Sequence, residues 1–466
     1  MSFLPATPLL QLAADLDAGR STSRALVETA LERIAAEGGN GGHAFICVDA
    51  ERARREADAQ DALRGAGVTL SPLAGLPLSI KDLFDVAGER TRAGSRVLDD
   101  APPAAADAPA VARVRRAGAV PLGRTNMSEF AFSGLGLNPW RGTPRSPWRD
   151  AATGEACVAG GSSSGAAASV AGGMAAAGLG SDTGGSLRIP AAFCGLTGFK
   201  PTAHRVPTRG MFPLSTTLDS TGAIAPTVAC CALVDRVLAG LPVDGDAARV
   251  RPAAPKGLRL AVLSNYVTEG MDAHVARAWD DALARLSRAG VQLTPLRLPL
   301  LERLPAINRF GFSPIEAYAT HRGRLDALAS RYDPRVLARI RVGETANAAD
   351  YIDLLAARAA AIEEARAALD GFDAFLMPTV PIAPPAIAAL EADPAHFAAT
   401  NALVLRNPSV VNFLDGCAVS LPCARRGAAP VGLSVAGLAE SDAHVLSVAA
   451  AIEGVLQRAF EGASAG

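Results

Sequence analysis

The chain is poor in lysine: only Lys81, Lys200 and Lys256 occur among its 45 basic residues. Arginine can serve wherever a permanent cation suffices, whereas lysine can lose its charge when it is buried. Lys81 lies in the apolar segment LPLSIKDLFDV, which we expect to form a buried strand. It is therefore a candidate for a role that arginine cannot fill, although an ordinary surface lysine is equally compatible with the pattern.

The charge and the cysteine content argue against a nucleic-acid-binding protein and against a disulfide-stabilised one. The formal net charge is −1, so the composition gives no support for nucleic-acid binding. The seven cysteines are odd in number and include no Cys-x-x-Cys pair. They indicate reduced thiols in a cytoplasmic protein rather than a disulfide framework.

Signals for membranes and metals are also missing. The N-terminal segment has no basic region, so we expect no signal peptide. The apolar run near Ala166–Leu179 is too short and too rich in glycine to span a membrane. No cluster of His, Cys, Asp and Glu has metal-ligand spacing, and we predict neither a metal nor another cofactor.

The most informative segment is GGSSSGAAASVAGGMAAAGLGSDTGGSLRIP, from Gly160 to Pro190. It holds two serine clusters, each after a Gly-Gly pair, with Ser162 and Ser186 24 residues apart. Glycines at this density suit a backbone that must approach a ligand closely. Serines in such loops indicate nucleophilic chemistry.

Strand-like and helical segments alternate along most of the chain. This alternation favours an α/β fold of three layers, with helices on both faces of a mixed, largely parallel central sheet. We expect one domain over residues 1–466. Its parts are N-terminal helices (1–70), a core (71–230), a second sheet region with a helical insertion (241–400), and C-terminal strands and a helix (401–466).

Two local predictions bear on the site. The small residues of Gly165–Ala177 predict a tightly packed helix between the serine clusters. The charged segment Pro314–Leu369 predicts the helices of the insertion.

Six segments between Leu73 and Gly222 resemble the amidase signature family in order and spacing. They are LAGLPLSIKDLFDVAG, GAVPLGRTNMSEFAFSG, NPWRGTPRSP, GGSSSGAAASVAGG, GLGSDTGGSLRIPAAFCGLTGFKPT and FPLSTTLDSTG. Each is a weak signal alone, but the set is specific. The resemblance implies an amidase-signature fold and hydrolysis of a small carboxylic amide to an acid plus ammonia or an amine.

The resemblance also implies a catalytic triad. Ser186 corresponds to the nucleophile, Ser162 to a bridging serine that follows a cis peptide bond, and Lys81 to the base. A lysine can act as a base near neutral pH only if burial lowers its pKa, and the apolar flanks of Lys81 fit this requirement. The expected course passes through an acyl-enzyme.

The loop around Ser186 should carry the groups that assist it. Backbone N–H groups are expected to bind the oxyanion, and the candidates are Thr183, Gly184, Gly185 and Ser186. Three side chains are expected to support this machinery: Ser163 within the triad network, and Asp182 and Arg188 as a pair that holds the loop. Lys200 and Cys194 are expected to be structural.

Two other interpretations remain open. The segment Gly161–Gly165 also satisfies G-x-S-x-G, which would make Ser163 the nucleophile of an α/β-hydrolase-type esterase, with Asp442 and His444 as a poorly spaced acid and histidine. The chain could instead be the glutaminase subunit of a tRNA-dependent amidotransferase, which resembles the same family. Against this, the segment LRNPSVVNFLDG has Leu405, Arg406 and Asn407 where such a glutaminase would be expected to carry an aspartate.

Substrate choice depends on residues outside the triad. The candidate pocket segments are Met127–Gly134, Met211–Ser215, Arg309–Tyr318 and Leu405–Asn412. Apolar or aryl acyl groups would be favoured by Phe130, Phe132, Phe310 and Phe312, and acidic substrates by Arg209, Arg309 or Arg406. Similar enzymes are often homodimers, and the sequence leaves the oligomeric state open.

Overall fold

The computed structural model describes residues 7–36 and 38–462, with side chains placed up to residue 457. Within these residues, eleven strands form one sheet. In spatial order they are β1 (Phe45–Val48), β3 (Val120–Thr125), β2 (Pro77–Lys81), β6 (Ala177–Asp182), β8 (Ser220–Ala225), β7 (Thr197–Lys200), β12 (Cys417–Pro422), β13 (Gly432–Gly437), β11 (Ala374–Pro378), β9 (Arg259–Leu263) and β10 (Gln292–Leu296). A separate ribbon pairs β4 (Arg145–Arg149) with β5 (Ala156–Val158).

The sheet is mixed, as the sequence predicts. Strands β3, β2 and β6 form one parallel block, and β11, β9 and β10 form another. The remaining neighbouring pairs are antiparallel, so the expectation of a largely parallel sheet holds for these two blocks but not for the centre. At β12 and β13 the cause is a short connecting loop, because parallel neighbours need a crossover of about a dozen residues or more.

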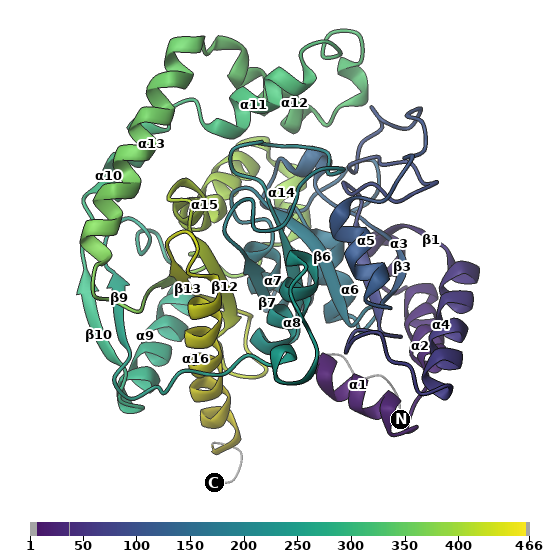
Figure 1. Cartoon of the computed structure of the whole chain (residues 1–466). Helices are drawn as coiled ribbons and strands as arrows, with labels where there is room; N and C mark the ends of the chain where they lie inside the picture. The colour runs from purple at the N-terminus through teal and green to yellow at the C-terminus, as the bar shows by residue number, and fades with distance from the viewer. Residues whose placement is uncertain (1–6, 37, 463–466) are drawn as a thin grey trace.

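Helices cover both faces of this sheet (Figure 1). Two apolar clusters mark the two faces: in β8, Ala223 belongs to one cluster and the next residue, Ile224, to the other. The helices are α1 (Leu9–Asp17), α2 (Ser23–Ala35), α3 (Gly41–Ala44), α4 (Ala50–Gly65), α5 (Pro109–Arg116), α6 (Ser164–Ala171), α7 (Arg188–Cys194), α8 (Val228–Ala239), α9 (Ala273–Arg288), α10 (Leu300–Ile307), α11 (Phe312–His321), α12 (Pro334–Val342), α13 (Ala348–Leu369), α14 (Ile387–Ala392), α15 (Pro394–Phe413) and α16 (Asp442–Gly462).

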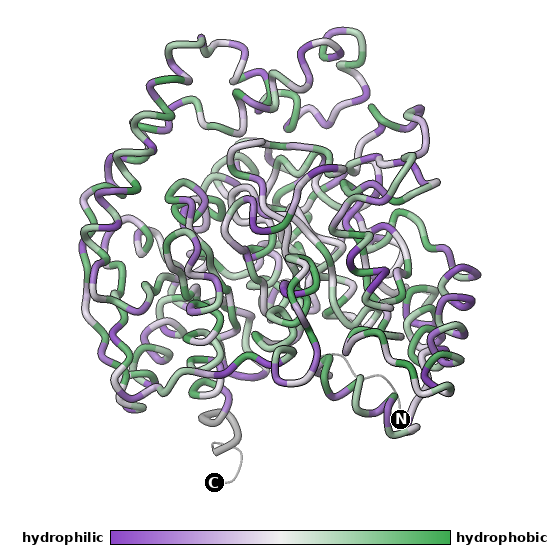
Figure 2. Tube along the Cα trace, viewed as in Figure 1, coloured by the Kyte–Doolittle hydropathy of each residue, from purple (hydrophilic) through white to green (hydrophobic). Residues whose placement is uncertain are grey.

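The layers follow from residue type. Helices α8 and α16 pack on one face, whereas α6 and α7 pack on the other. Hydrophilic residues gather on the outer helices, most visibly on α4, while the strands are mostly hydrophobic or neutral (Figure 2). Among the helices of the described residues, we find none whose length and apolar character would allow it to cross a membrane.

The segment between the serine clusters differs from its prediction. The helix expected over Gly165–Ala177 ends at Ala171, and the chain turns at Gly172 and Gly173 before β6 begins. Glycine with positive φ ends helices readily, as at Gly173 with φ 63°. A turn and a short connection over residues 172–176 thus replace the predicted end of the helix, and the central strand β6 begins at Ala177.

The insertion consists of α10 to α13, which arch over the edge of the sheet (Figure 1). Its helical character over Pro314–Leu369 is confirmed. An apolar cluster that includes Leu301, Phe312 and Leu354 joins it to the sheet and to α15. The insertion is therefore packed against both the sheet and α15.

Close backbone packing at α6 generates a stability prediction. A Cβ atom at Gly165 would lie 2.2 Å from the Ala44 carbonyl oxygen and 2.6 Å from the Asn126 nitrogen. We expect Gly165→Ala to lower the free energy of unfolding by about 1–3 kcal/mol, measured by thermal and urea denaturation. The control is Gly65→Ala at the end of α4, where no atom lies within 4 Å and stability should be unchanged or slightly higher. Equal melting temperatures for the two variants would contradict this packing argument.

Candidate active site

Lys81 ends strand β2 and is fully buried. Its Nζ donates to Ser162 Oγ at 2.7 Å and to Ser181 Oγ at 2.8 Å. The first contact joins two of the three predicted triad residues. Ser181, on the neighbouring strand β6, was not singled out from the sequence.

The protonation of Lys81 is set by its surroundings. Burial lowers its pKa to about 7, although the carboxylates of Asp182 and Asp219 act in the opposite direction. A substantial fraction of the amine is therefore neutral near neutral pH, unlike that of a solvated lysine.

Ser162 and Ser163 lie in the loop before α6. The Gly161–Ser162 peptide bond is cis, as the resemblance implied. A Cβ at Gly161 would lie 2.6 Å from the Gly136 nitrogen, so the close approach of these two loops requires glycine. Ser163 donates through Oγ to the Ser181 carbonyl at 3.2 Å, and through its N–H to the Ser186 carbonyl at 3.2 Å. The two serine loops are thus tied together by their backbones.

A buried ion pair shapes the loop that carries Ser186. Arg188 donates to both carboxylate oxygens of Asp182, at 2.9 and 3.0 Å, and both side chains are fully buried. Burial would raise the pKa of Asp182, but the Arg188 guanidinium holds it well below its usual range. The predicted pairing of these residues is therefore present, and Asp182 also accepts from the N–H of Leu187 at 3.1 Å.

The four backbone groups expected to bind an oxyanion are not equivalent. The N–H of Gly185 donates to Asp182 at 2.8 Å, so it is already engaged. Among the described residues, no acceptor is found for the N–H groups of Gly184 and Ser186. The side chain of Thr183 is fixed by a 2.5 Å hydrogen bond from its Oγ1 to Asp219.

Ser186 opens on a cavity of about 260 Å³. All four segments expected to form the pocket contribute to its wall, for example through Phe132, Leu214, Phe312 and Leu405. Phe130 instead packs in an aromatic cluster with Phe212, His321 and Tyr332. Phe310 lies outside the cavity wall, under the Arg309 guanidinium.

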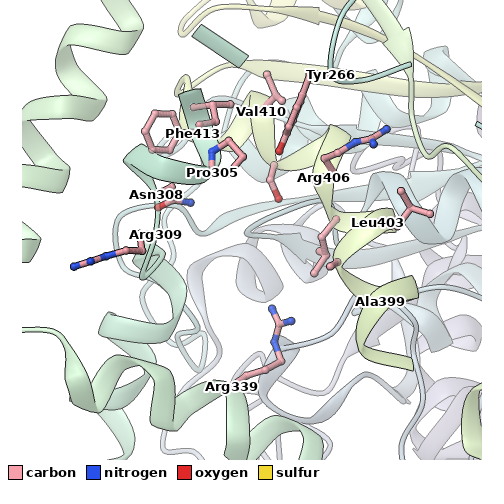
Figure 3. Close-up of a pocket in the computed structure, with 14 residues that line it drawn as sticks. Tyr266, Pro305, Asn308, Arg309, Arg339, Ala399, Leu403, Arg406, Val410 and Phe413 are labelled. Carbon is pink, nitrogen blue, oxygen red and sulfur yellow. The ribbon is translucent and has the colours of Figure 1, made fainter. Parts of the chain in front are cut away.

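A larger pocket of about 720 Å³ adjoins this cavity and shares Asn308, Arg339 and Leu405 with it. In Figure 3 the Arg339 guanidinium points toward the open centre, whereas Arg309 and Arg406 point away. Arg406 donates to backbone carbonyls, and the side chain of Arg309 is 70% exposed. These two arginines, proposed from the sequence as substrate ligands, are thus poorly directed for that role.

Arg339 on α12 was missed from the sequence, because it lies in an ordinary amphipathic pattern. It stacks over Phe132 at 4.5 Å, and its buried Nε has no hydrogen-bond partner. Within residues 7–36 and 38–457, no carboxylate lies within ion-pair distance of it. Burial lowers its pKa to about 10, so it stays charged near neutral pH. An unpaired cation therefore faces the cavity.

The remaining candidates are structural. Lys200 donates to the carbonyls of Pro201 and Gly416, and Cys194 is buried with its pKa raised by burial. No described histidine contacts Ser163, and His444 is half exposed beside Asp373. In the part of the chain that the structure covers, no three His, Cys, Asp or Glu residues are grouped to hold a metal.

Comparison with known proteins places this geometry in a family. A family model described as amidase matches residues 25–446. The chain belongs to the amidase family. It is accordingly an amide-hydrolysing enzyme with a mixed α/β fold.

Three relatives illustrate the range of this family. The chain is 35% identical to 2-amino-5-chloromuconic acid deaminase of Comamonas testosteroni, covering 89% of this chain and 88% of the relative. It is 34% identical to one of the subunits of glutamyl-tRNA(Gln) amidotransferase from Chromohalobacter salexigens, covering 95% of both. A crystal structure of an amidase superposes with a TM-score of 0.85 at 34% identity, covering 97% of this chain and all of the other.

Proposed function

We propose that the chain hydrolyses a small carboxylic amide with Ser186 as nucleophile, Ser162 as proton bridge and Lys81 as base. The observation that carries the proposal is the 2.7 Å hydrogen bond between Ser162 and a fully buried lysine. A lysine that is shielded from solvent and paired with no carboxylate can be neutral near neutral pH. It can then act as the base that a serine hydroxyl needs for activation.

The chemistry follows from the arrangement. Neutral Lys81 takes the Ser162 proton while Ser162 takes that of Ser186, whose oxygen attacks the amide carbon. The resulting oxyanion is bound by the N–H groups of Gly184 and Ser186, with Thr183 as a further candidate. Lys81 and Ser162 then return the proton to the leaving nitrogen. Water, activated in the same way, hydrolyses the acyl-enzyme to free acid.

The cavity favours a substrate that carries a carboxylate. Arg339 brings a charged guanidinium to the space beside Ser186; it forms no ion pair with the described side chains, and its buried Nε has no hydrogen-bond partner. Such a group is well suited to a carboxylate, because a bidentate pair that includes Nε would satisfy this buried donor. The relative from Comamonas testosteroni is likewise named for an acid. Phe132 and Phe312 supply apolar walls for the rest of the molecule.

The glutaminase function within an amidotransferase is the second candidate. The similarity to the glutamyl-tRNA(Gln) amidotransferase protein favours it, and a glutamine carboxylate would also suit Arg339. Against it, the pocket-lining part of α15 offers Leu405, Ser409 and Asn412 and no carboxylate for an amino group. A stand-alone amidase is therefore the preferred function, and hydrolysis of simple amides by the purified chain separates the two.

Labelling with a fluorophosphonate tests the nucleophile. We expect one adduct per chain, mapped by peptide mass to Ser186, and none in Ser186→Ala. The control Ser163→Ala should keep the adduct, because Ser163 contacts only backbone carbonyls and N–H groups. An adduct on Ser163 in the wild type would instead support the α/β-hydrolase interpretation.

The pH dependence of kcat/KM tests the base. Only the neutral amine can accept a proton, so activity should fall as pH drops below about 7, where Lys81 becomes protonated. Lys81→Arg remains charged and should lose roughly 10²–10⁴-fold in kcat. The exposed Lys256→Arg is the control and should behave as wild type. Turnover by Lys81→Arg at the wild-type rate would exclude Lys81 as the base.

The substrate class can be tested on paired amides that differ only in a carboxylate. We expect Arg339→Met to lower kcat/KM about ten- to hundredfold for the acidic member, because one charged hydrogen-bonding partner is lost. The neutral member should change little. Arg309→Met, which removes an exposed arginine of the same region, is the control. Equal losses on both amides would count against carboxylate recognition.

A further inference from the structure

A buried glutamate of the insertion is fully engaged with a segment that borders the active site. Glu316, on α11, is 9% exposed. Its carboxylate accepts from Ser215 Oγ, Thr217 Oγ1, the Thr217 N–H at 3.2 Å and Tyr351 OH at 2.6 Å. We refer to Glu316, Ser215, Thr217 and Tyr351 as the Glu316 network.

The network holds the segment Leu214–Asp219, which we call the wall segment. Ser215 Oγ accepts from the Leu218 N–H at 3.2 Å, and its carbonyl accepts from the Asp219 N–H at 2.9 Å. Leu214 and Leu218 line the cavity beside Ser186. Fixing Ser215 therefore fixes both a part of the cavity wall and the position of Asp219.

Asp219 carries this constraint to the loop of the nucleophile. One of its carboxylate oxygens accepts from Thr183 Oγ1 at 2.5 Å, and the other accepts from the Leu214 N–H at 3.0 Å. Thr183 directly precedes Gly184, whose N–H is a candidate oxyanion donor. A chain of short contacts thus leads from the insertion to the oxyanion site.

We propose that Glu316 is a positioning residue, which sets the oxyanion donors through the wall segment and the Asp219–Thr183 hydrogen bond. This inference rests on the proposed function, because it assigns a task to the same oxyanion site. An oxyanion donor acts only when it is held at hydrogen-bond distance from the developing charge, and misplacement by about 1 Å can cost on the order of 10²-fold. Glu316 touches no reacting atom, so its effect is indirect.

The test compares Glu316→Gln with wild type on an amide that the wild type hydrolyses, and on a fluorophosphonate. Intact-mass titration of the phosphonate adduct counts competent sites, so a loss of folded protein is separated from a loss of rate. Per titrated site, we expect kcat and the rate constant of phosphonylation to fall together by at least about tenfold, while KM changes less than about threefold. The control is Glu363→Gln on α13, where the side chain is 68% exposed and paired with Arg366.

A double-mutant cycle tests the route. Thr183→Val removes the hydroxyl bonded to Asp219, so Glu316→Gln should have a smaller effect in that background than in wild type. Additive losses, or a rate per site within about twofold of wild type for Glu316→Gln, would overturn the proposal. If Glu316→Gln gives no folded protein, Tyr351→Phe and Ser215→Ala replace it, and wild-type rates for both would overturn it equally. A wild type without any adduct on Ser186 would refute the proposed function itself.

Discussion

The whole site depends on burying the amine of Lys81 in the sheet without an adjacent carboxylate that would stabilise its charged form. Lys81 bonds to the hydroxyls of Ser162 and Ser181, which are neutral, and burial favours its neutral form. The carboxylate of Asp182 has the largest opposing influence, because its negative charge raises the pKa of Lys81. Because Arg188 binds both oxygens of this carboxylate, the negative charge of Asp182 is balanced by Arg188 instead of by Lys81. The ion pair beside Ser186 therefore has an electrostatic effect as well as a structural one.

The same loop shows why small residues surround the serines. A Cβ at Gly180 would lie 2.7 Å from Ser163 Oγ, and one at Gly161 would lie 2.7 Å from Ser128 Oγ. Strand β6 and the two serine loops can approach this closely only because side chains are missing at these positions. Close approach in turn excludes water from Lys81. The glycine-rich composition thus permits the close packing that buries Lys81, and this burial lowers the pKa of the lysine.

The sequence predicted the parts of the molecule whose signals are local. Apolar runs such as that around Lys81 predicted strands correctly, and six ordered motifs indicated the family and the contact between Lys81 and Ser162. Strand β6 was missed, because its alanine and two glycines lack the branched side chains that mark strands. Ser181 and Arg339 were missed for another reason. Each contacts residues that are distant in the sequence, and the residues next to it in the sequence do not indicate those contacts.

The sheet and the helical insertion contribute different groups to the site. Lys81, Ser162 and Ser186 lie on the sheet and its adjoining loops, where close packing at the glycines leaves little room for added side chains. Arg339 and Phe312 belong to the insertion, whose helices touch the cavity with only a few side chains. Substrate preference can therefore change through α11 and α12 while the chemistry persists. Changes in α11 are limited by Glu316, since the helix that carries Phe312 also binds the wall segment, whose Asp219 accepts a hydrogen bond from Thr183.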